Sequence, residues 1–67
     1  MRISINQEEA TLNTDSDLMQ ALNSIGMSDA RGIAVAVNNK VIPKARWESH
    51  LLEENDKITI IRATQGG

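Results

Sequence analysis

The sequence ends in Gly66-Gly67, the part of the chain best suited to chemistry. Glycine has no side chain, so a diglycine end can pass through a slot too narrow for other residues. Its terminal carboxylate is ionised at neutral pH, which makes it a nucleophile toward phosphorus but a poor acyl electrophile. Attack on the α-phosphate of ATP would give an acyl-adenylate, from which a sulfur or nitrogen nucleophile could displace AMP. The alternative interpretation is that the two glycines are frayed chain without a role.

The chain itself lacks the means to activate this carboxylate. It contains no phosphate-binding loop of the form G-x-x-x-x-G-K-[ST]. With no cysteine and a single histidine, His50, it cannot build a zinc site, an iron–sulfur site, a disulfide framework or a thiol nucleophile. We therefore expect a carrier that binds no cofactor, with the adenylating machinery on another protein.

Delivering the carboxylate requires a strand that ends close to it. Residues 57–62 alternate, which predicts two isoleucines facing a core and Thr59 and Ile61 on the opposite side. The remaining residues, 63–67, could extend roughly 17 Å as a flexible tail. That reach suits delivery into another protein's active site. We predict one folded domain over residues 1–62 and a tail over residues 63–67.

The first half of the chain predicts a hairpin and a helix. Residues 1–6 alternate apolar and polar, and the short polar segment 7–9 is predicted to turn the chain into a strand at residues 10–12. One helical stripe then contains Leu18, Ala21, Leu22 and Ile25. Thr14 and Asp17 have the spacing of a capping box before that stripe, and Gly26 supplies the left-handed residue that ends a helix.

The second half predicts strands joined by an irregular crossover. Residues 33–37 alternate, and Asn38-Asn39 tolerates the positive φ of a tight turn into a short strand that Pro43 ends. Residues 44–52 read as a crossover with a short helical turn around Trp47. One helix then covers one sheet, which predicts an α+β fold of two layers.

Composition argues against two classes of partner. Seven lysines and arginines against nine acidic residues give a net charge of −2, and the scattered cations form no stripe that would bind nucleic acid. The longest apolar run, residues 33–37, is far shorter than a membrane span, which needs about 20 residues. The amino end lacks a signal-peptide pattern. We expect a cytoplasmic protein that binds neither nucleic acid nor membrane.

The chain resembles the ThiS family of sulfur carrier proteins of thiamin biosynthesis, in the ubiquitin-like β-grasp superfamily. The similarity spans nearly the whole chain. The residues that carry it are Ala36-Val37-Asn38, Val41-Ile42-Pro43, Trp47, Leu52, Asp56, Ile58 to Arg62, and Ala63-Thr64-Gln65-Gly66-Gly67. Asn55 stands where relatives often have glycine, and asparagine tolerates the same left-handed conformation.

The resemblance implies a β-grasp fold, a mixed sheet of four to five strands with one helix packed across it and the first and last strands side by side. It implies that a ThiF/E1-like adenylyltransferase, using ATP and Mg²⁺ in trans, adenylates the carboxylate of Gly67, which follows Gly66. A sulfur donor such as a cysteine desulfurase would then give a thiocarboxylate for thiazole synthase (ThiG). The chain would be a protein co-substrate, monomeric when free, and not an enzyme.

The outer face of the sheet is a candidate docking surface. Ser4, Ala34, Ala36, Thr59 and Ile61 form a shallow patch of small and apolar groups beside the tail. The expected partner-binding residues are Ala34, Ala36, Thr59, Ile61, Arg62, Ala63, Thr64 and Gln65.

Two alternatives to this function stay open. A molybdopterin-synthase small subunit or a tRNA-thiolation carrier has the same ending, although such relatives tend to be longer. A β-grasp binding module with idle glycines is the other.

The remaining polar and aromatic residues have simpler interpretations. His50 has no visible partner and reads as a surface or crossover residue. Trp47, the only aromatic residue, is expected to fill the core. Asp15 and Asp17 at a helix start are expected to favour the helix dipole rather than a metal. The acidic segment 53–56 reads as a solvated turn, or as an acidic edge that meets a basic partner.

Overall fold

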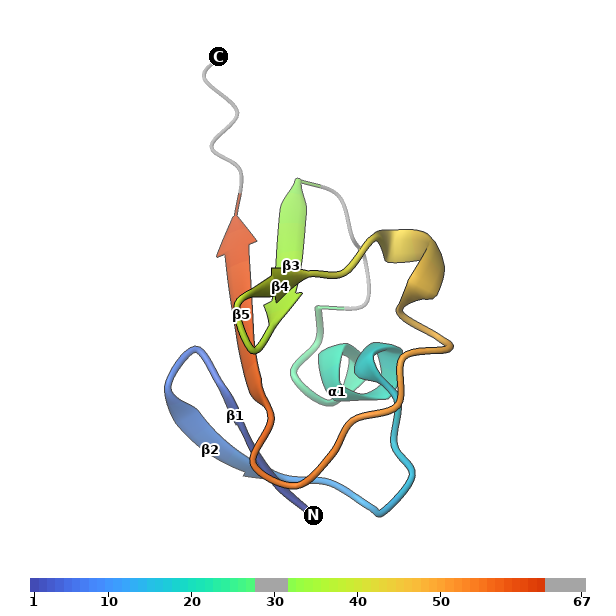
Figure 1. Ribbon diagram of the computed structural model, residues 1–67. Coiled ribbons are helices and arrows are strands. Elements are labelled where there is room, and N and C mark those ends of the chain that lie inside the picture. Colours follow the sequence, from blue (N-terminus) through green and yellow to red (C-terminus); the bar gives the residue numbers. More distant parts are fainter. Residues whose placement is uncertain (28–31, 63–67) are drawn as a thin grey trace.

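The computed structural model describes residues 1–27 and 32–62, so the predicted tail, residues 63–67, lies outside the described residues. Figure 1 shows the strands, the α-helix and a 3₁₀ helix in the described part. In chain order they are β1 (Arg2–Ile5), β2 (Glu8–Thr11), α1 (Leu18–Ser24), β3 (Ile33–Val37), β4 (Lys40–Val41), the 3₁₀ helix (Lys44–Arg46) and β5 (Lys57–Arg62). In these two stretches, no helix is long and apolar enough to cross a membrane.

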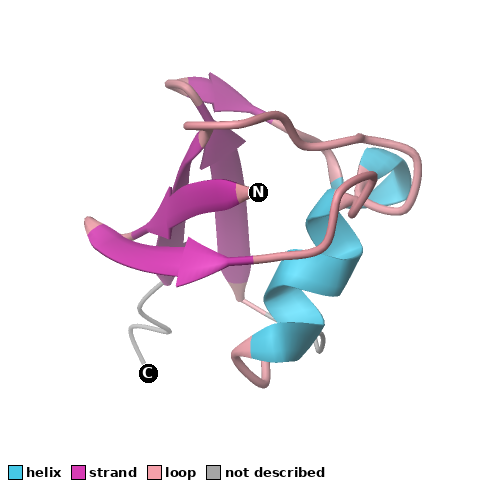
Figure 2. Cartoon of the chain, turned by 90° about the horizontal axis from the view of Figure 1, so that it is seen from below, coloured by secondary structure: helices cyan, strands magenta, loops and turns pink. Residues whose placement is uncertain are grey.

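The strands form one mixed sheet of five in the order β2-β1-β5-β3-β4. β1 and β5 are parallel, whereas each other neighbouring pair is antiparallel. The first and last strands therefore lie side by side, as the resemblance implied. Figure 2 shows α1 against one face of the sheet. The predicted α+β fold, a mixed sheet with one helix packed across it, is confirmed.

The core lies between the sheet and α1. It contains Ile3, Ile5, Leu18, Ala21, Leu22, Val35, Val37, Ile42, Trp47, Leu52 and Ile58. The strand members alternate along β1, β3 and β5, which confirms the faces predicted from the period of two. The helix members fall on the predicted stripe.

The turn between β1 and β2 falls earlier than predicted. Ile5 pairs with Glu8, which leaves a loop of two residues, Asn6 and Gln7, both with positive φ (50° and 71°). Two consecutive positive φ values are typical of a type I′ hairpin turn, which matches the twist of the flanking strands. The prediction that residues 7–9 form the turn is therefore wrong, because Glu8 and Glu9 already belong to β2.

Replacing Gln7 with glycine is expected to stabilise the protein. A left-handed backbone costs an ordinary L-residue about 1–2 kcal/mol and glycine almost nothing, so the free energy of unfolding should rise by about 1 kcal/mol. Urea unfolding followed by circular dichroism measures this change. Gln7→Ala keeps the backbone penalty and serves as the control. An equal rise in that variant would contradict the backbone explanation.

The amino end of α1 is capped by Asp17, so the predicted cap at Thr14 is wrong. The Asp17 carboxylate accepts a hydrogen bond from the Gln20 backbone N–H at 2.8 Å, and the Gln20 side chain accepts one from the Asp17 N–H at 2.8 Å. This is a reciprocal capping box. Asp15 lies between the two candidate caps with φ 71°, which is incompatible with a helix that starts after Thr14.

The carboxyl end of α1 closes at Gly26 as predicted. Gly26 has φ 76°, and its N–H donates to the Asn23 carbonyl while the Met27 N–H donates to the Leu22 carbonyl. These two bonds form a Schellman motif. The helix ends just before Ile25, which is 43% exposed. Ile25 was predicted as the last residue of the buried stripe, but it lies at the surface.

The crossover contains the predicted helical turn. Pro43 precedes the 3₁₀ helix, and Trp47 follows it with a side chain only 1% exposed. The Trp47 Nε1–H donates to the Ile42 carbonyl at 2.8 Å. The expected structural role of Trp47 is confirmed.

Asp56 does not behave as part of a solvated turn, which corrects one of the sequence predictions. Its side chain is buried, and its two oxygens accept hydrogen bonds from the Asn38 side-chain amide at 2.9 Å and from the Glu53 N–H at 2.8 Å. The side-chain oxygen of Asn38, Oδ1, in turn accepts a hydrogen bond from the Lys57 N–H at 3.0 Å. Asp56 therefore ties the acidic turn to the β3–β4 hairpin and to the start of β5. Asn55 has the left-handed φ, 72°, that was expected of it.

Candidate functional site

β5 leads toward the diglycine end, and hydrogen bonds from both sides hold it. Where β1 stops, Asn6 continues its edge: the Asn6 N–H donates to the Ile58 carbonyl at 2.9 Å, and the Ile60 N–H donates to the Asn6 side-chain oxygen at 2.8 Å. On the other side, β3 pairs as far as Arg62, which lies opposite Ile33. The strand is thus fixed up to the last residue that is described.

The reactive residues predicted from the sequence, Gly66 and Gly67, lie outside the described residues. The same is true of the predicted partner contacts Ala63, Thr64 and Gln65. What the structure places is the point from which they depart. Figure 1 shows the carboxyl end of β5 at the opposite end of the sheet from the amino terminus.

The outer face of β3, β4 and β5 carries four of the docking residues predicted on the sheet. Arg62 does not share this face, because it lies opposite Ile33, which packs against the core. Ala34 lies opposite Ile61, and Ala36 lies between Thr59 on β5 and Val41 on β4. We call these five residues the outer-face patch. Ile61 is 54% exposed and Val41 is 63% exposed, whereas Ala36 is only 7% exposed.

Ala36 is covered although it faces away from the core, because its methyl group is shorter than the side chains of its two cross-strand neighbours. Val41 was not among the predicted docking residues, but it provides the exposed apolar surface next to Ala36. Its signal was the tight Asn38-Asn39 turn, which sets Val41 opposite Ala36. The partner-binding role of these residues stays a prediction.

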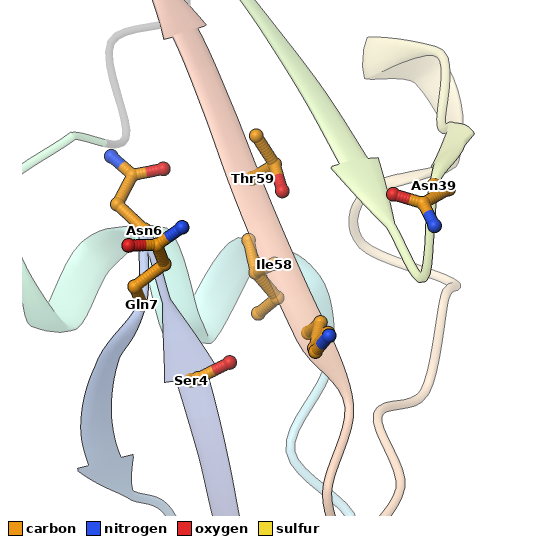
Figure 3. A pocket seen from close by; sticks show the side chains of 7 residues that line it. Ser4, Asn6, Gln7, Asn39, Ile58 and Thr59 are labelled. Carbon is orange, nitrogen blue, oxygen red and sulfur yellow. The ribbon is translucent and has the colours of Figure 1, made fainter.

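The outer face of the sheet also contains a hollow that was not predicted. Figure 3 shows it at the start of β5, between the two hairpin turns, and its lining consists of Ser4, Asn6, Gln7, Asn39, Lys57, Ile58 and Thr59. Six of its seven lining residues carry amide, hydroxyl or ammonium groups, so it can offer hydrogen bonds as well as apolar contact. Finding it requires knowing that both turns flank one strand, which only the topology shows.

The other candidates do not form a site. His50 is half-buried in the crossover, and its carbonyl accepts the Leu18 N–H at 2.9 Å. Asp17 caps the helix, as expected of an acidic residue at that end. Within residues 1–27 and 32–62, no group of three or more histidine or acidic side chains is placed to share a metal ion.

The comparison with protein families decides which family this chain represents. The model described as the ThiS family matches residues 2–67. The chain belongs to the ThiS family. The match includes the folded domain and both glycines, so the ThiS resemblance predicted from the sequence is confirmed.

Individual ThiS proteins match over their whole length. The sulfur carrier protein ThiS of Escherichia coli (strain K12) is 24% identical over 67 residues, which is all of both chains. A crystal structure of a thiamine biosynthesis protein (ThiS) from Geobacter metallireducens has a TM-score of 0.84 at 16% identity, with both chains fully covered. A solution NMR structure of a thiamine biosynthesis protein from the same organism has a TM-score of 0.76 at 16% identity, and the match covers all of this chain and 88% of that one. These structures share the fold.

Several residues that carry the ThiS resemblance serve the fold. Asn38 and Asp56 hydrogen-bond each other, and Trp47 is bonded to the carbonyl of Ile42. Their functional groups are occupied within the protein. The reactive role of the diglycine end stays a prediction for this ThiS-family chain.

Proposed function

We propose that this ThiS-family chain is a sulfur carrier of thiamin biosynthesis whose Gly67 carboxylate is converted to a thiocarboxylate. The observation that carries the proposal is the family match, which continues beyond β5 to Gly67. The strand that precedes this end is paired with β3 as far as Arg62, and on the side of β1 it is hydrogen-bonded as far as Ile60. A partner then binds the folded domain and thereby positions the reactive carboxyl end.

The chemistry takes two steps. In the first, a carboxylate oxygen of Gly67 attacks the α-phosphorus of ATP, and the bond to the β-phosphate breaks with release of pyrophosphate. In the second, a sulfur nucleophile forms a bond to the activated acyl carbon, and AMP leaves with the former carboxylate oxygen. A hydrosulfide nucleophile gives the thiocarboxylate directly. The persulfide of a cysteine desulfurase gives an acyl disulfide, and a thiol of a partner protein then cleaves its S–S bond, which oxidises the partner's thiol to a disulfide and leaves the thiocarboxylate. A thiazole synthase takes up the sulfur of this thiocarboxylate.

The proposal assigns catalysis to partner proteins. The sequence has no phosphate-binding loop, so a ThiF/E1-like adenylyltransferase binds ATP and Mg²⁺, and this chain is a protein co-substrate rather than an enzyme. A sulfur donor such as a cysteine desulfurase supplies the sulfur, and the thiazole synthase ThiG consumes it.

Intact-mass spectrometry tests the proposal. Incubation with the cognate adenylating enzyme, ATP, Mg²⁺ and a sulfur donor should add about 16 Da, the difference between a sulfur and an oxygen atom. A variant that lacks Gly67 should remain unmodified and keep its melting temperature, because the deletion removes none of the described residues. No shift in the wild type, or an equal shift in the shortened chain, would contradict the proposal.

Purified acceptor enzymes can identify the pathway. The thiocarboxylate form should lose its added mass when it is incubated with thiazole synthase and its other substrates. Loss only with a molybdopterin-forming or tRNA-thiolating enzyme would assign the carrier to that pathway instead.

Replacing Ile61 with aspartate is expected to weaken binding of the adenylating partner without unfolding the domain. Ile61 is exposed on the outer-face patch, so a carboxylate there keeps its hydration in the free protein but loses it in an apolar interface. The dissociation constant, measured by calorimetry, should rise about tenfold or more. The melting temperature should change little.

Ile60→Asp is the matched control, since Ile60 is the preceding residue but packs against the core. This variant is expected to lose stability. If Ile61→Asp lowered the melting temperature as much as Ile60→Asp, Ile61 would be a core residue and the docking role would fail.

A further inference from the structure

Every second residue of β2 directs its backbone N–H and C=O groups toward β1. Met1 and Leu12 exchange two hydrogen bonds, from the amino-terminal nitrogen to the Leu12 carbonyl at 2.8 Å and from the Leu12 N–H to the Met1 carbonyl at 2.9 Å. Bonded and non-bonded pairs alternate along an antiparallel ladder. The backbone groups of Ala10 and Glu8 therefore also point toward β1.

Glu9 and Thr11 accordingly direct their backbone N–H and C=O groups away from β1. The residue opposite Glu9 agrees with this alternation, because Ser4 donates its N–H to the Asp56 carbonyl on the far side of β1, at 3.0 Å. Among the residues that the structure describes, none forms a hydrogen bond with these groups of Glu9 and Thr11. β2 is one of the two edge strands of the sheet (Figure 1). Two donors and two acceptors are thus free to pair with an extended chain.

An apolar hollow lies beside this free edge. Ala10 of β2 and two residues that follow α1, Ile25 and Met27, line it, together with Ile5, Asn6, Glu8 and Glu9. Ile25 is 43% exposed, which is unusual for an isoleucine beside a core. Side chains alternate along a strand, so the residue of an added strand opposite Ala10 would project to the side of the sheet that α1 covers, beside Ile25.

The edge is acidic. Glu8 and Glu9 are exposed. Among residues 1–27 and 32–62, the cation paired with them is Arg2, whose Nε lies 3.8 Å from a carboxylate oxygen of Glu9, with both side chains mostly in solvent. Such an exposed pair is weak and easily exchanged for another cation. Lysine or arginine side chains on an added strand would meet two carboxylates on adjacent positions.

We infer that the free edge of β2 binds an extended segment of a partner protein as an additional antiparallel strand. The segment carries an apolar residue opposite Ala10, followed by two basic residues opposite Glu9 and Glu8. Main-chain hydrogen bonds to Glu9 and Thr11 supply the pairing, and the apolar side chain fills the hollow beside Ile25. This inference is independent of the carrier function, since β1 separates β2 from β5.

A second copy of this chain fits the edge less well. Pairing two β2 strands would gather two copies of Glu8 and Glu9 along one short edge, where like charges destabilise a sheet. Acidic residues on an edge strand also protect it against self-association. A basic segment is therefore the better occupant.

Nuclear magnetic resonance with a synthetic peptide tests the inference. The probe is a blocked heptapeptide, Thr-Val-Thr-Val-Lys-Lys-Thr, added to the full-length protein labelled with ¹⁵N. The amide signals of Glu9 and Thr11 should shift, and their hydrogen exchange should slow. The side chains of Ile25 and Met27 should shift with the same dissociation constant.

Two modified peptides separate strand pairing from charge. Methylation of the backbone nitrogen of the first lysine removes the hydrogen bond to the Glu9 carbonyl and should weaken binding about fivefold or more. A peptide with both lysines replaced by glutamate should bind about fivefold more weakly or not at all. Both comparisons use the unaltered protein, so they do not depend on the folding of a variant.

A charge exchange in the protein provides the complementary test. The double variant Glu8→Lys with Glu9→Lys should weaken binding of the lysine peptide and restore binding of the glutamate peptide. Glu48→Lys with Glu53→Lys changes the net charge equally at exposed positions outside β2 and should leave the lysine peptide unaffected.

Several results would overturn the inference. These are equal affinity for the methylated peptide, shifts confined to the outer-face patch, and no binding of any peptide. Shifts of Glu9 and Thr11 that appear when the protein alone is concentrated would assign the edge to a second copy instead. None of these results would bear on the thiocarboxylate test, because the peptide titration involves no sulfur transfer.

Discussion

Trp47→Ala is expected to remove a large share of the protein's stability. The side chain is 1% exposed and lies in the core with residues of the sheet and of α1. Its removal costs about 3–5 kcal/mol. A chain of this length has a total stability of about 3–10 kcal/mol, so the loss consumes a large share. Urea unfolding followed by far-ultraviolet circular dichroism measures the effect, since the variant has no tryptophan fluorescence.

The reason for so large an effect is the position of Trp47 between two layers. Its indole N–H donates to the Ile42 carbonyl at 2.8 Å, and its own carbonyl accepts the Met19 N–H at 3.1 Å. It therefore joins the end of β4 to the start of α1. Trp47→Phe keeps an aromatic ring and loses the indole donor, so it should cost clearly less than the alanine variant. Equal losses would mean that the hydrogen bond, not the buried area, dominates.

Asp56→Ala is expected to reduce the free energy of unfolding by about 2–3 kcal/mol, because hydrogen bonds to a charged group are stronger than neutral ones and their partners are left unpaired. The lost partners are the Asn38 side-chain amide and the Glu53 N–H. Loss of the first also releases the side chain that accepts from the Lys57 N–H at the start of β5. The unfolding midpoint in urea measures the change.

Glu53→Ala is the control for this prediction. Glu53 is exposed and lies in the same acidic turn, but it contributes its backbone N–H, which alanine retains. Its stability should stay within about 0.5 kcal/mol of the wild type. If the two variants lost the same amount, the turn would be a solvated acidic segment after all.

Patterns that depend on neighbouring residues predicted the fold well. The alternation in β1, β3 and β5 and the stop at Gly26 need no knowledge of the rest of the chain. The tight turn at Asn38-Asn39 is similar, since both residues hold positive φ as expected (52° and 70°). Each feature follows from local sterics or from a single buried face.

Two local predictions failed, the turn at residues 7–9 and the helix cap at Thr14. The other features that were missed depend on contacts between distant segments. Asp56 looked like any acidic residue of a turn, and its burial follows from Asn38, which is far away in the sequence. Ala36 was expected to be an exposed member of the outer face, but residues of two other strands cover it. The polar hollow at the start of β5 likewise requires two hairpins on either side of one strand.

The position of β5 between β1 and β3 also determines how this protein can fold during synthesis. β1 with β2 and β3 with β4 are two hairpins that can form early, but neither pairs with the other. The strand that joins them, β5, is synthesised after the other four. Until then, an incomplete chain presents two open sheet edges to its surroundings, which is a hazard for aggregation. Completion of the sheet must therefore await the synthesis of β5.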